Sequence, residues 1–273
     1  MLLFVQGNRG IFGLGSRLSE SVYSSSTSPF RGDLNAKYTP LWERLALASP
    51  SGRRNYSVWV NAQDARKGSV QFSGEDHSRY EGTLASVPLN LDPQTGLISE
   101  WRVNLTGVTR VYPRVHVEDP IIKLLTPARY TTAFSLDTGS PNMYVPTALY
   151  KAIAADLNAT EVVNGAPYVP CSLCSSRSGS LLFVFETSTR GVEATIRVTY
   201  SEIIYPHGYP VTVPPVEGRN EEGMCHFGVV PSDGPVRLLR ATAYVVFDAD
   251  EKEVRMAQAK WDIVHGAVDS IEL

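Results

Sequence analysis

One short segment, Phe134-Ser135-Leu136-Asp137-Thr138-Gly139-Ser140, places a carboxylate, two hydroxyls and a glycine at the end of an apolar strand. The apolar residues would deliver Asp137 into a partly desolvated site, where a carboxylate changes its acid–base behaviour. Gly139 would let the backbone turn tightly and let a second loop come close. Thr138 could hydrogen-bond across to that second loop, and Ser140 could hold the outer carboxylate oxygen. The segment therefore indicates carboxylate acid–base chemistry.

This chemistry needs two such loops, because two carboxylates held close together share one proton and a water. Like charges at that distance cannot both ionise, so one group acts as a base and its partner as an acid. The pair then titrates as a unit. Asp-Thr-Gly is also a common turn tripeptide, so a plain turn stays open on these residues alone. The 273 residues contain no second Asp-Thr-Gly or Asp-Ser-Gly.

Other chemical patterns in the chain are weaker. Gly13-Leu14-Gly15 lacks the third glycine and the preceding strand–helix context of a dinucleotide loop, so a strand turn is expected there. Cys225 lies beside His226, but a disulfide-bonded cysteine cannot act as a nucleophile. No Gly-x-Ser-x-Gly elbow occurs. The histidines show no ligand spacing such as His-x3-His: they are His77, His116, His207, His226 and His265. We therefore expect neither a metal nor a cofactor.

The elements that must position Asp137 are mostly short strands rich in β-branched and aromatic residues, bounded by turn residues. We expect strands at 56–60, 69–72, 101–105, 181–185, 194–198 and 243–247. One segment, Thr147 to Leu157, has helical spacing, with Leu149, Ile153 and Leu157 on one face and Thr147 as its cap. Many strands with one clear helix predict an all-β sandwich or barrel-like lobe.

Composition excludes some partners. The net charge is −3 and 19% of residues are charged, so the basic stripe of a nucleic-acid-binding protein is missing. No run approaches the ~18 apolar residues that span a bilayer. The first residues, Met1 to Gly7, have no basic region and no full apolar core, so they do not match a signal peptide.

Two weaker patterns point outside the cell. Asn55, Asn104 and Asn158 begin glycosylation sequons. The three cysteines, Cys171, Cys174 and Cys225, allow at most one intrachain disulfide, and the residue count leaves the pairing open.

The segment from Ala133 to Leu157 resembles the second catalytic loop of pepsin-like aspartic peptidases: an apolar strand, Asp-Thr-Gly-Ser, a second apolar strand, a proline and a helix. The resemblance extends in order along most of the chain and is closest to fungal secreted or cell-wall-anchored members. Its other matches are Gly10–Gly15, Tyr56–Asn61, Gly68–Asp76, Tyr80–Gly82, Cys225–Gly228, Ala243–Asp248 and Glu253–Gln258.

This resemblance implies an all-β, pepsin-like acid protease fold that is incomplete. Residues 1–82 would form the end of the N-terminal lobe and the inter-lobe strands, and residues 83–273 would form the C-terminal lobe. Asp137, Thr138, Gly139 and Ser140 would be catalytic, and the substrate would be an extended peptide. Cys171 would pair with Cys225, which leaves Cys174 as the odd thiol. The location implied is extracellular or the cell wall.

The chain departs from the family at two places. The family's first catalytic loop would precede Gly10–Gly15 and does not occur. The glycine segment that usually threads behind the second aspartate loop is replaced by Pro235 to Thr242, which contains no glycine and looks damaged.

Three functions follow from these departures. The first is an aspartic endopeptidase by family that is truncated, and inactive as this chain. The second is a non-catalytic binding protein on the same scaffold. The third is a homodimer in which each copy supplies one Asp137.

Overall fold

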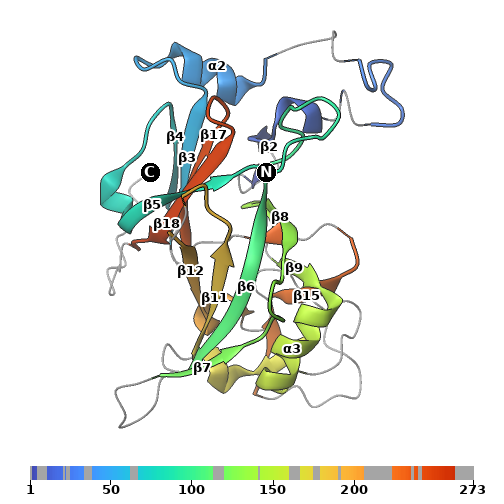
Figure 1. Cartoon of the computed structure of the whole chain (residues 1–273), viewed down its shortest axis with the longest axis vertical. Helices are drawn as coiled ribbons and strands as arrows, with labels where there is room; N and C mark the ends of the chain where they lie inside the picture. Colours follow the sequence, from blue (N-terminus) through green and yellow to red (C-terminus); the bar gives the residue numbers. More distant parts are fainter. Residues whose placement is uncertain are drawn as a thin grey trace, which may run out of the picture.

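Strands dominate the chain in the computed structural model (Figure 1). The structure describes residues 2–4, 11–20, 22, 25–33, 39–61, 67–112, 120–140, 142–159, 167–174, 179–189, 192–205, 223–234, 237–238 and 242–261. Everything below concerns these residues. Three of the five histidines, His116, His207 and His265, lie outside them.

The larger sheet has eight strands and carries the Asp137 loop. Its order is β12-β11-β6-β8-β16-β9-β15, and β7 pairs with the far end of β6. Pairing is antiparallel from β12 to β8, whereas β8 runs parallel to β16, and β9 runs parallel to β15. The strands are β6 (Arg102–Tyr112), β7 (Ile121–Leu124), β8 (Thr132–Leu136), β9 (Met143–Pro146), β11 (Ser180–Phe185), β12 (Ala194–Thr199), β15 (Val229–Ser232) and β16 (Arg237–Leu238).

A second sheet joins distant parts of the chain. It has five antiparallel strands in the order β4-β3-β17-β18-β5. They are β3 (Asn55–Val60), β4 (Gly68–Phe72), β5 (Tyr80–Pro88), β17 (Ala243–Asp248) and β18 (Glu253–Ala259). The last two strands therefore lie between β3 and β5, which both precede Asp137 in the sequence.

The remaining strands form two small sheets. One pairs β1 (Leu2–Phe4) with β2 (Ile11–Gly13), and the other has the order β10-β14-β13. The strands of the latter are β10 (Tyr168–Pro170), β13 (Ile204–Tyr205) and β14 (Met224–Phe227). Four 3-10 turns connect elements: η1 (Arg17–Ser19), η2 (His77–Arg79), η3 (Cys171–Cys174) and η4 (Tyr200–Glu202).

The structure describes two α-helices, α2 (Leu41–Ala48) and α3 (Thr147–Leu157). In Figure 1, α2 lies at the top of the view and α3 at the lower right. Helix α3 follows β9 directly and buries Leu149, Ile153 and Leu157, as its spacing predicts. Helix α2 was not expected. With eight residues it is too short to be stable alone, and burial of Trp42 and Ala46 fixes it against the rest of the chain.

One continuous apolar core lies under both large sheets. Fully buried side chains from the eight-stranded sheet, such as Phe134 and Phe183, belong to the same cluster as Tyr56 and Phe247 from the five-stranded sheet. A second, smaller cluster lies around Trp59 and Tyr244. Shared burial therefore fixes the strand that delivers Asp137 to the rest of the molecule.

The expected all-β class and strand positions are confirmed. The six predicted strands fall on β3, β4, β6, β11, β12 and β17, and the predicted helix matches α3. The predicted cap of that helix is wrong. Pro146 is the N-cap residue, and the Thr147 hydroxyl donates to Asp233 Oδ1 at 2.6 Å instead of capping the first turn.

Candidate active-site loop

Asp137 lies in the loop between β8 and β9, the two strands that flank the short strand β16. Strand β8 ends at Leu136, whose backbone N–H donates to the Trp101 carbonyl at 2.8 Å. The alternation of buried Phe134 and Leu136 with half-buried Ser135 fixes the register of β8. Asp137 itself is half-buried at the strand end, as the sequence predicts.

The first turn of the loop is stabilised by the aspartate itself. The Gly139 backbone N–H donates to Asp137 Oδ1 at 2.9 Å, so this carboxylate oxygen already accepts one bond within the loop.

Ser140 hydrogen-bonds to the backbone of Asn142. Its hydroxyl donates to the Asn142 carbonyl at 2.9 Å and lies 3.3 Å from the Asn142 backbone N–H, which donates to it. The hydroxyl therefore closes the end of the loop, where β9 begins.

Thr138 carries an unsatisfied polar atom. Its Oγ1 is buried and has no hydrogen-bond partner among the residues that the structure describes. A buried hydroxyl without a partner costs free energy, roughly 1–3 kcal/mol. The position is therefore built for a donor or acceptor that the described residues do not supply.

Within the segment Pro235 to Thr242, the structure describes strand β16 and Thr242. The backbone of Arg237 and Leu238 runs parallel to Ser135 and Leu136 of β8, and Arg237 also pairs with Tyr144 of β9. These two residues therefore lie between the two strands that hold the Asp137 loop.

Two further residues support the loop, and sequence analysis assigned neither to it. Asn142 Oδ1 lies 3.3 Å from His226 Nε2, which belongs to β14. His226 is 5% exposed, and its ring stacks on Tyr205 at 5.9 Å. Burial lowers the pKa of His226, because it disfavours the charged ring. The two partners are 84 positions apart in the sequence, so no local spacing could indicate the contact.

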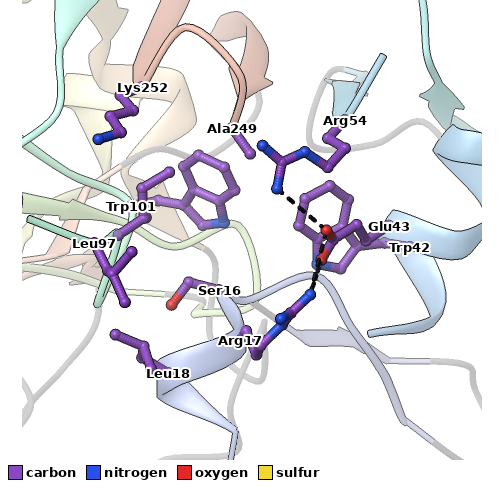
Figure 2. Close-up of a pocket in the computed structure, with 11 residues that line it drawn as sticks. Ser16, Arg17, Leu18, Trp42, Glu43, Arg54, Leu97, Trp101, Ala249 and Lys252 are labelled. Carbon is purple, nitrogen blue, oxygen red and sulfur yellow. Dashed lines mark hydrogen bonds and ion pairs between the residues drawn. The ribbon is translucent and has the colours of Figure 1, made fainter. Parts of the chain in front are cut away.

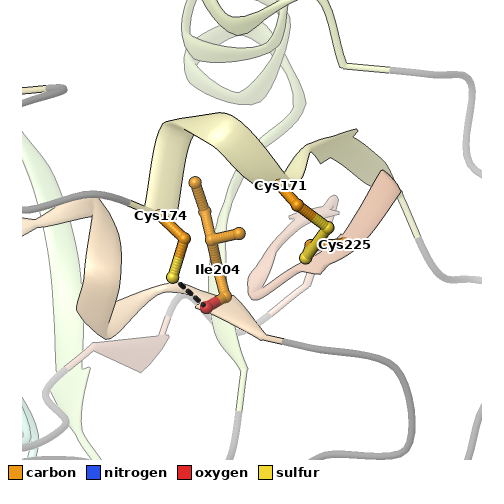
Figure 3. Close-up of a disulfide and its surroundings, with 4 residues drawn as sticks. All are labelled: Cys171, Cys174, Ile204 and Cys225. Atoms are coloured by element: carbon orange, nitrogen blue, oxygen red, sulfur yellow. Dashed lines mark hydrogen bonds between the residues drawn. A yellow bond between two sulfur atoms is a disulfide. The ribbon is translucent and has the colours of Figure 1, made fainter. Parts of the chain in front are cut away.

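A disulfide fixes the small sheet that carries His226. Figure 3 shows Cys171 of η3 joined to Cys225 of β14, the pairing that the family resemblance implies, with Cα atoms 4.9 Å apart. Cys174 is not part of this bond, and its thiol donates to the Ile204 carbonyl at 3.6 Å. Burial raises the pKa of the Cys174 thiol.

The described residues contain no cluster of three or more histidine, cysteine, aspartate or glutamate side chains that could hold a metal ion. In the same part of the chain, no helix has the length and apolar character needed to cross a bilayer.

Comparison with known proteins places this loop in context. The model of the eukaryotic aspartyl protease family matches residues 2–259. A probable aspartic-type endopeptidase, opsB of Aspergillus oryzae, is 31% identical over 212 residues, which cover 76% of this chain and 39% of the relative. OPSB of Arthroderma benhamiae is 27% identical over 258 residues, which cover 93% of this chain and 48% of that protein. An acid protease of Saccharomycopsis fibuligera is 26% identical over 258 residues, 93% of this chain and 57% of its own length. The chain spans about half the length of such relatives.

Proposed function

The chain belongs to the eukaryotic aspartyl protease family, and from that premise we propose that its Asp137 loop is one half of an endopeptidase active site. The observation that supports this most directly is the geometry of the loop. Asp137-Thr138-Gly139-Ser140 lies at the end of β8, and β16 threads between the two flanking strands. The proposed reaction is hydrolysis of a peptide bond by an activated water.

Each loop residue has a proposed role in that reaction. Asp137 shares a proton with a second carboxylate, and the pair activates the water and protonates the leaving amine. The buried Thr138 hydroxyl bonds to the loop that carries the second carboxylate. Gly139 donates its N–H to Asp137, and Ser140 keeps the loop closed through Asn142.

We propose that this chain alone does not catalyse the reaction, because its sequence holds a single Asp-Thr-Gly loop. One carboxylate cannot act as acid and base at once. The second would come from a longer gene product, in keeping with relatives about twice as long as the chain. In that product, residues 1–82 would close the N-terminal lobe and join the lobes, and residues 83–273 would form the C-terminal lobe.

The proposed substrate is an extended peptide, bound in a cleft between the lobes through strand-like backbone hydrogen bonds. The proposed location is extracellular or at the cell wall. The disulfide between Cys171 and Cys225 supports this, because disulfides persist in oxidising compartments. Of the three sequon asparagines, Asn158 is exposed, whereas Asn55 is 4% exposed and donates to Asp248. A glycan would therefore be attached at Asn158 and not at Asn55.

Peptide cleavage at acid pH tests the proposed function. The natural gene product, purified from its source, should cleave a fluorogenic peptide, and Asp137→Asn should reduce the rate on the order of a thousandfold or more. The present chain, assayed alone, should show no cleavage that depends on Asp137.

Two outcomes would contradict the proposal. Cleavage by this chain alone that depends on Asp137 and rises with the square of its concentration would assign the second carboxylate to another copy. A natural product that begins at Met1 and is inactive would indicate a binding protein on the same scaffold.

A further inference from the structure

A pocket of about 300 Å³ lies between α2, η1 and the turn that joins β17 to β18 (Figure 2). Pockets for small ligands begin at roughly this size. Its lining is Ser16, Arg17, Leu18, Trp42, Glu43, Arg54, Leu97, Ile98, Trp101, Ala249 and Lys252.

The walls of this pocket are apolar and rigid. Trp42 and Trp101 meet edge to face at 6.1 Å, and they are 2% and 4% exposed. Their indole N–H groups already donate to backbone carbonyls, Trp42 to Gly15 at 2.9 Å and Trp101 to Leu14 at 3.1 Å. The rings therefore offer carbon surface to an occupant, and Leu18 and Leu97 extend that surface, as Figure 2 shows.

The polar part of the lining is unbalanced in charge. Three of its residues are cationic, Arg17, Arg54 and Lys252, and one is anionic, Glu43. The side chain of Glu43 is 8% exposed, and its two oxygens bind Arg17 Nη2 at 3.2 Å and Arg54 Nη1 at 3.5 Å. One arginine is enough to neutralise the charge of Glu43, so the lining carries an excess of positive charge.

The cations are also accessible. The side chains of Arg17 and Arg54 are 33% and 43% exposed. Arg54 additionally binds Asp250, which lies outside the lining, whereas Arg17 gives only Nη2 to Glu43. Lys252 Nζ contacts the Gly96 carbonyl at 3.2 Å and has further N–H donors. Arg17 and Lys252 therefore have donors that an anionic group at the mouth could use.

We propose that this pocket binds a small apolar carboxylate, with its hydrocarbon part against Leu18, Leu97 and the indole edges that line the pocket, and its carboxylate at Arg17. Charge-assisted bonds from arginine to carboxylate are stronger than neutral ones, and the fork of a guanidinium suits both oxygens. The same chemistry is carried by a medium-chain fatty acid and by the carboxyl end of a peptide that finishes in an apolar residue. The proposal does not rest on catalysis by Asp137.

Tryptophan fluorescence and calorimetry on the purified chain test the site. The probes are decanoate for the fatty-acid source and N-acetyl-Leu-Phe with a free carboxyl for the peptide source. Decan-1-ol and the same peptide as its amide are the uncharged controls. We expect one of the two acids to bind saturably at one molecule per chain, at least about tenfold tighter than its uncharged control. Which acid does so identifies the source.

Variants locate the site. Arg17→Gln should weaken binding about tenfold, whereas Arg197→Gln, which removes the same charge from an exposed position on β12, should leave it unchanged. Ala249→Phe should abolish binding by filling the pocket. Thermal melts show which variants fold, and Arg17→Gln keeps the test valid if Ala249→Phe does not.

Three results would overturn the proposal. The first is equal affinity for acids and uncharged controls, and the second is no saturable binding of either acid. The third is binding that Arg17→Gln and a folded Ala249→Phe both leave intact.

Discussion

Thr138 has a buried hydroxyl that lacks a hydrogen-bond partner among the described residues. The Oγ1 atom is buried without a hydrogen bond, although its neighbours Asp137, Gly139 and Ser140 all bond within the loop. A sequence motif indicates that the hydroxyl has a role, and the structure shows that this role is not fulfilled inside the described residues. The cost of that arrangement can be measured.

Thr138→Val should leave stability unchanged or raise it by up to about 1 kcal/mol, because it removes a buried oxygen that has no partner. The matched control is Thr126→Val. Thr126 is 6% exposed, and its Oγ1 accepts from the Val108 N–H at 3.2 Å, so its loss should cost roughly 1–3 kcal/mol. Urea unfolding of both variants provides the comparison. A loss at Thr138 as large as that at Thr126 would mean that the hydroxyl has a partner.

His226 makes stability depend on pH. In the folded chain burial lowers its pKa below the usual value of 6.5, so the unfolded chain binds the proton first as pH falls. Its Nδ1 is buried without a partner among the residues that the structure describes, and protonation would leave a buried N–H there with no acceptor from them. Stability should therefore fall as pH drops below about 6.5, by at most about 1.4 kcal/mol per pH unit from this group, until the folded pKa is reached.

His226→Gln should remove this part of the slope. The measurement is the free energy of unfolding of both proteins from pH 8 to pH 4. Their difference should be constant above pH 7 and change only below it. Carboxylates such as Asp156 act at lower pH. Burial raises the pKa of Asp156, but hydrogen bonds from Lys123 and Arg110 outweigh it, so its contribution is lost only below about pH 3.8. Parallel pH curves for the two proteins would rule out the role of His226.

At the level of elements, the sequence predicted those whose signal is local. The strand 181–185 was predicted from a short run of apolar and aromatic residues, and the helix 147–157 from its helical periodicity. Both signals are contained within a few neighbouring residues. Helix α2 was missed because tertiary burial of Trp42 stabilises it more than its short sequence does. The N-cap of α3 was misassigned because the Thr147 hydroxyl has a better partner, Asp233, 86 positions away.

The candidate site divides in the same way. The type of loop at Asp137 is a local pattern, so the sequence predicted it. The position of β16 between β8 and β9 depends on backbone pairing with segments about 100 residues distant. The contact of His226 with Asn142 is equally non-local. Such contacts arise only when the fold brings the elements together.

Helix α3 is fixed to β6 by a buried ion pair, and breaking it should be costly. The Arg110 side chain is 5% exposed, and its Nη1 lies 3.2 Å from Asp156 Oδ2. Asp156→Ala would leave the guanidinium buried and short of a counter-charge, which should destabilise the fold by about 2–4 kcal/mol. Glu251→Gln is the control, because its pair with Arg53 is largely exposed and should matter by less than about 1 kcal/mol. Thermal unfolding of both variants decides between buried and surface behaviour.

On the scale of the whole molecule, stability depends on joins between distant segments. The five-stranded sheet places β17 and β18 between β3 and β5, so β17 and β18 connect β3 and β4 to β5 through their hydrogen bonds. The small sheet β10-β14-β13 is held in addition by the bond between Cys171 and Cys225, which are separated by 54 positions. Closing a loop of that length lowers the entropy of the unfolded chain.

Replacing both Cys171 and Cys225 by serine should therefore destabilise the protein by up to about 4 kcal/mol. The loss of the disulfide should also loosen the contact of His226 with Asn142 near the Asp137 loop, because Cys225 and His226 are neighbours on β14. The control is Cys174→Ala, which removes a half-buried thiol that donates to the Ile204 carbonyl at 3.6 Å, and should cost about 1 kcal/mol or less. Urea unfolding with and without reductant separates the two effects: reductant should destabilise the Cys174→Ala protein and leave the double serine variant unchanged. If reductant does not weaken the Cys174→Ala protein, the bond between Cys171 and Cys225 does not stabilise the fold.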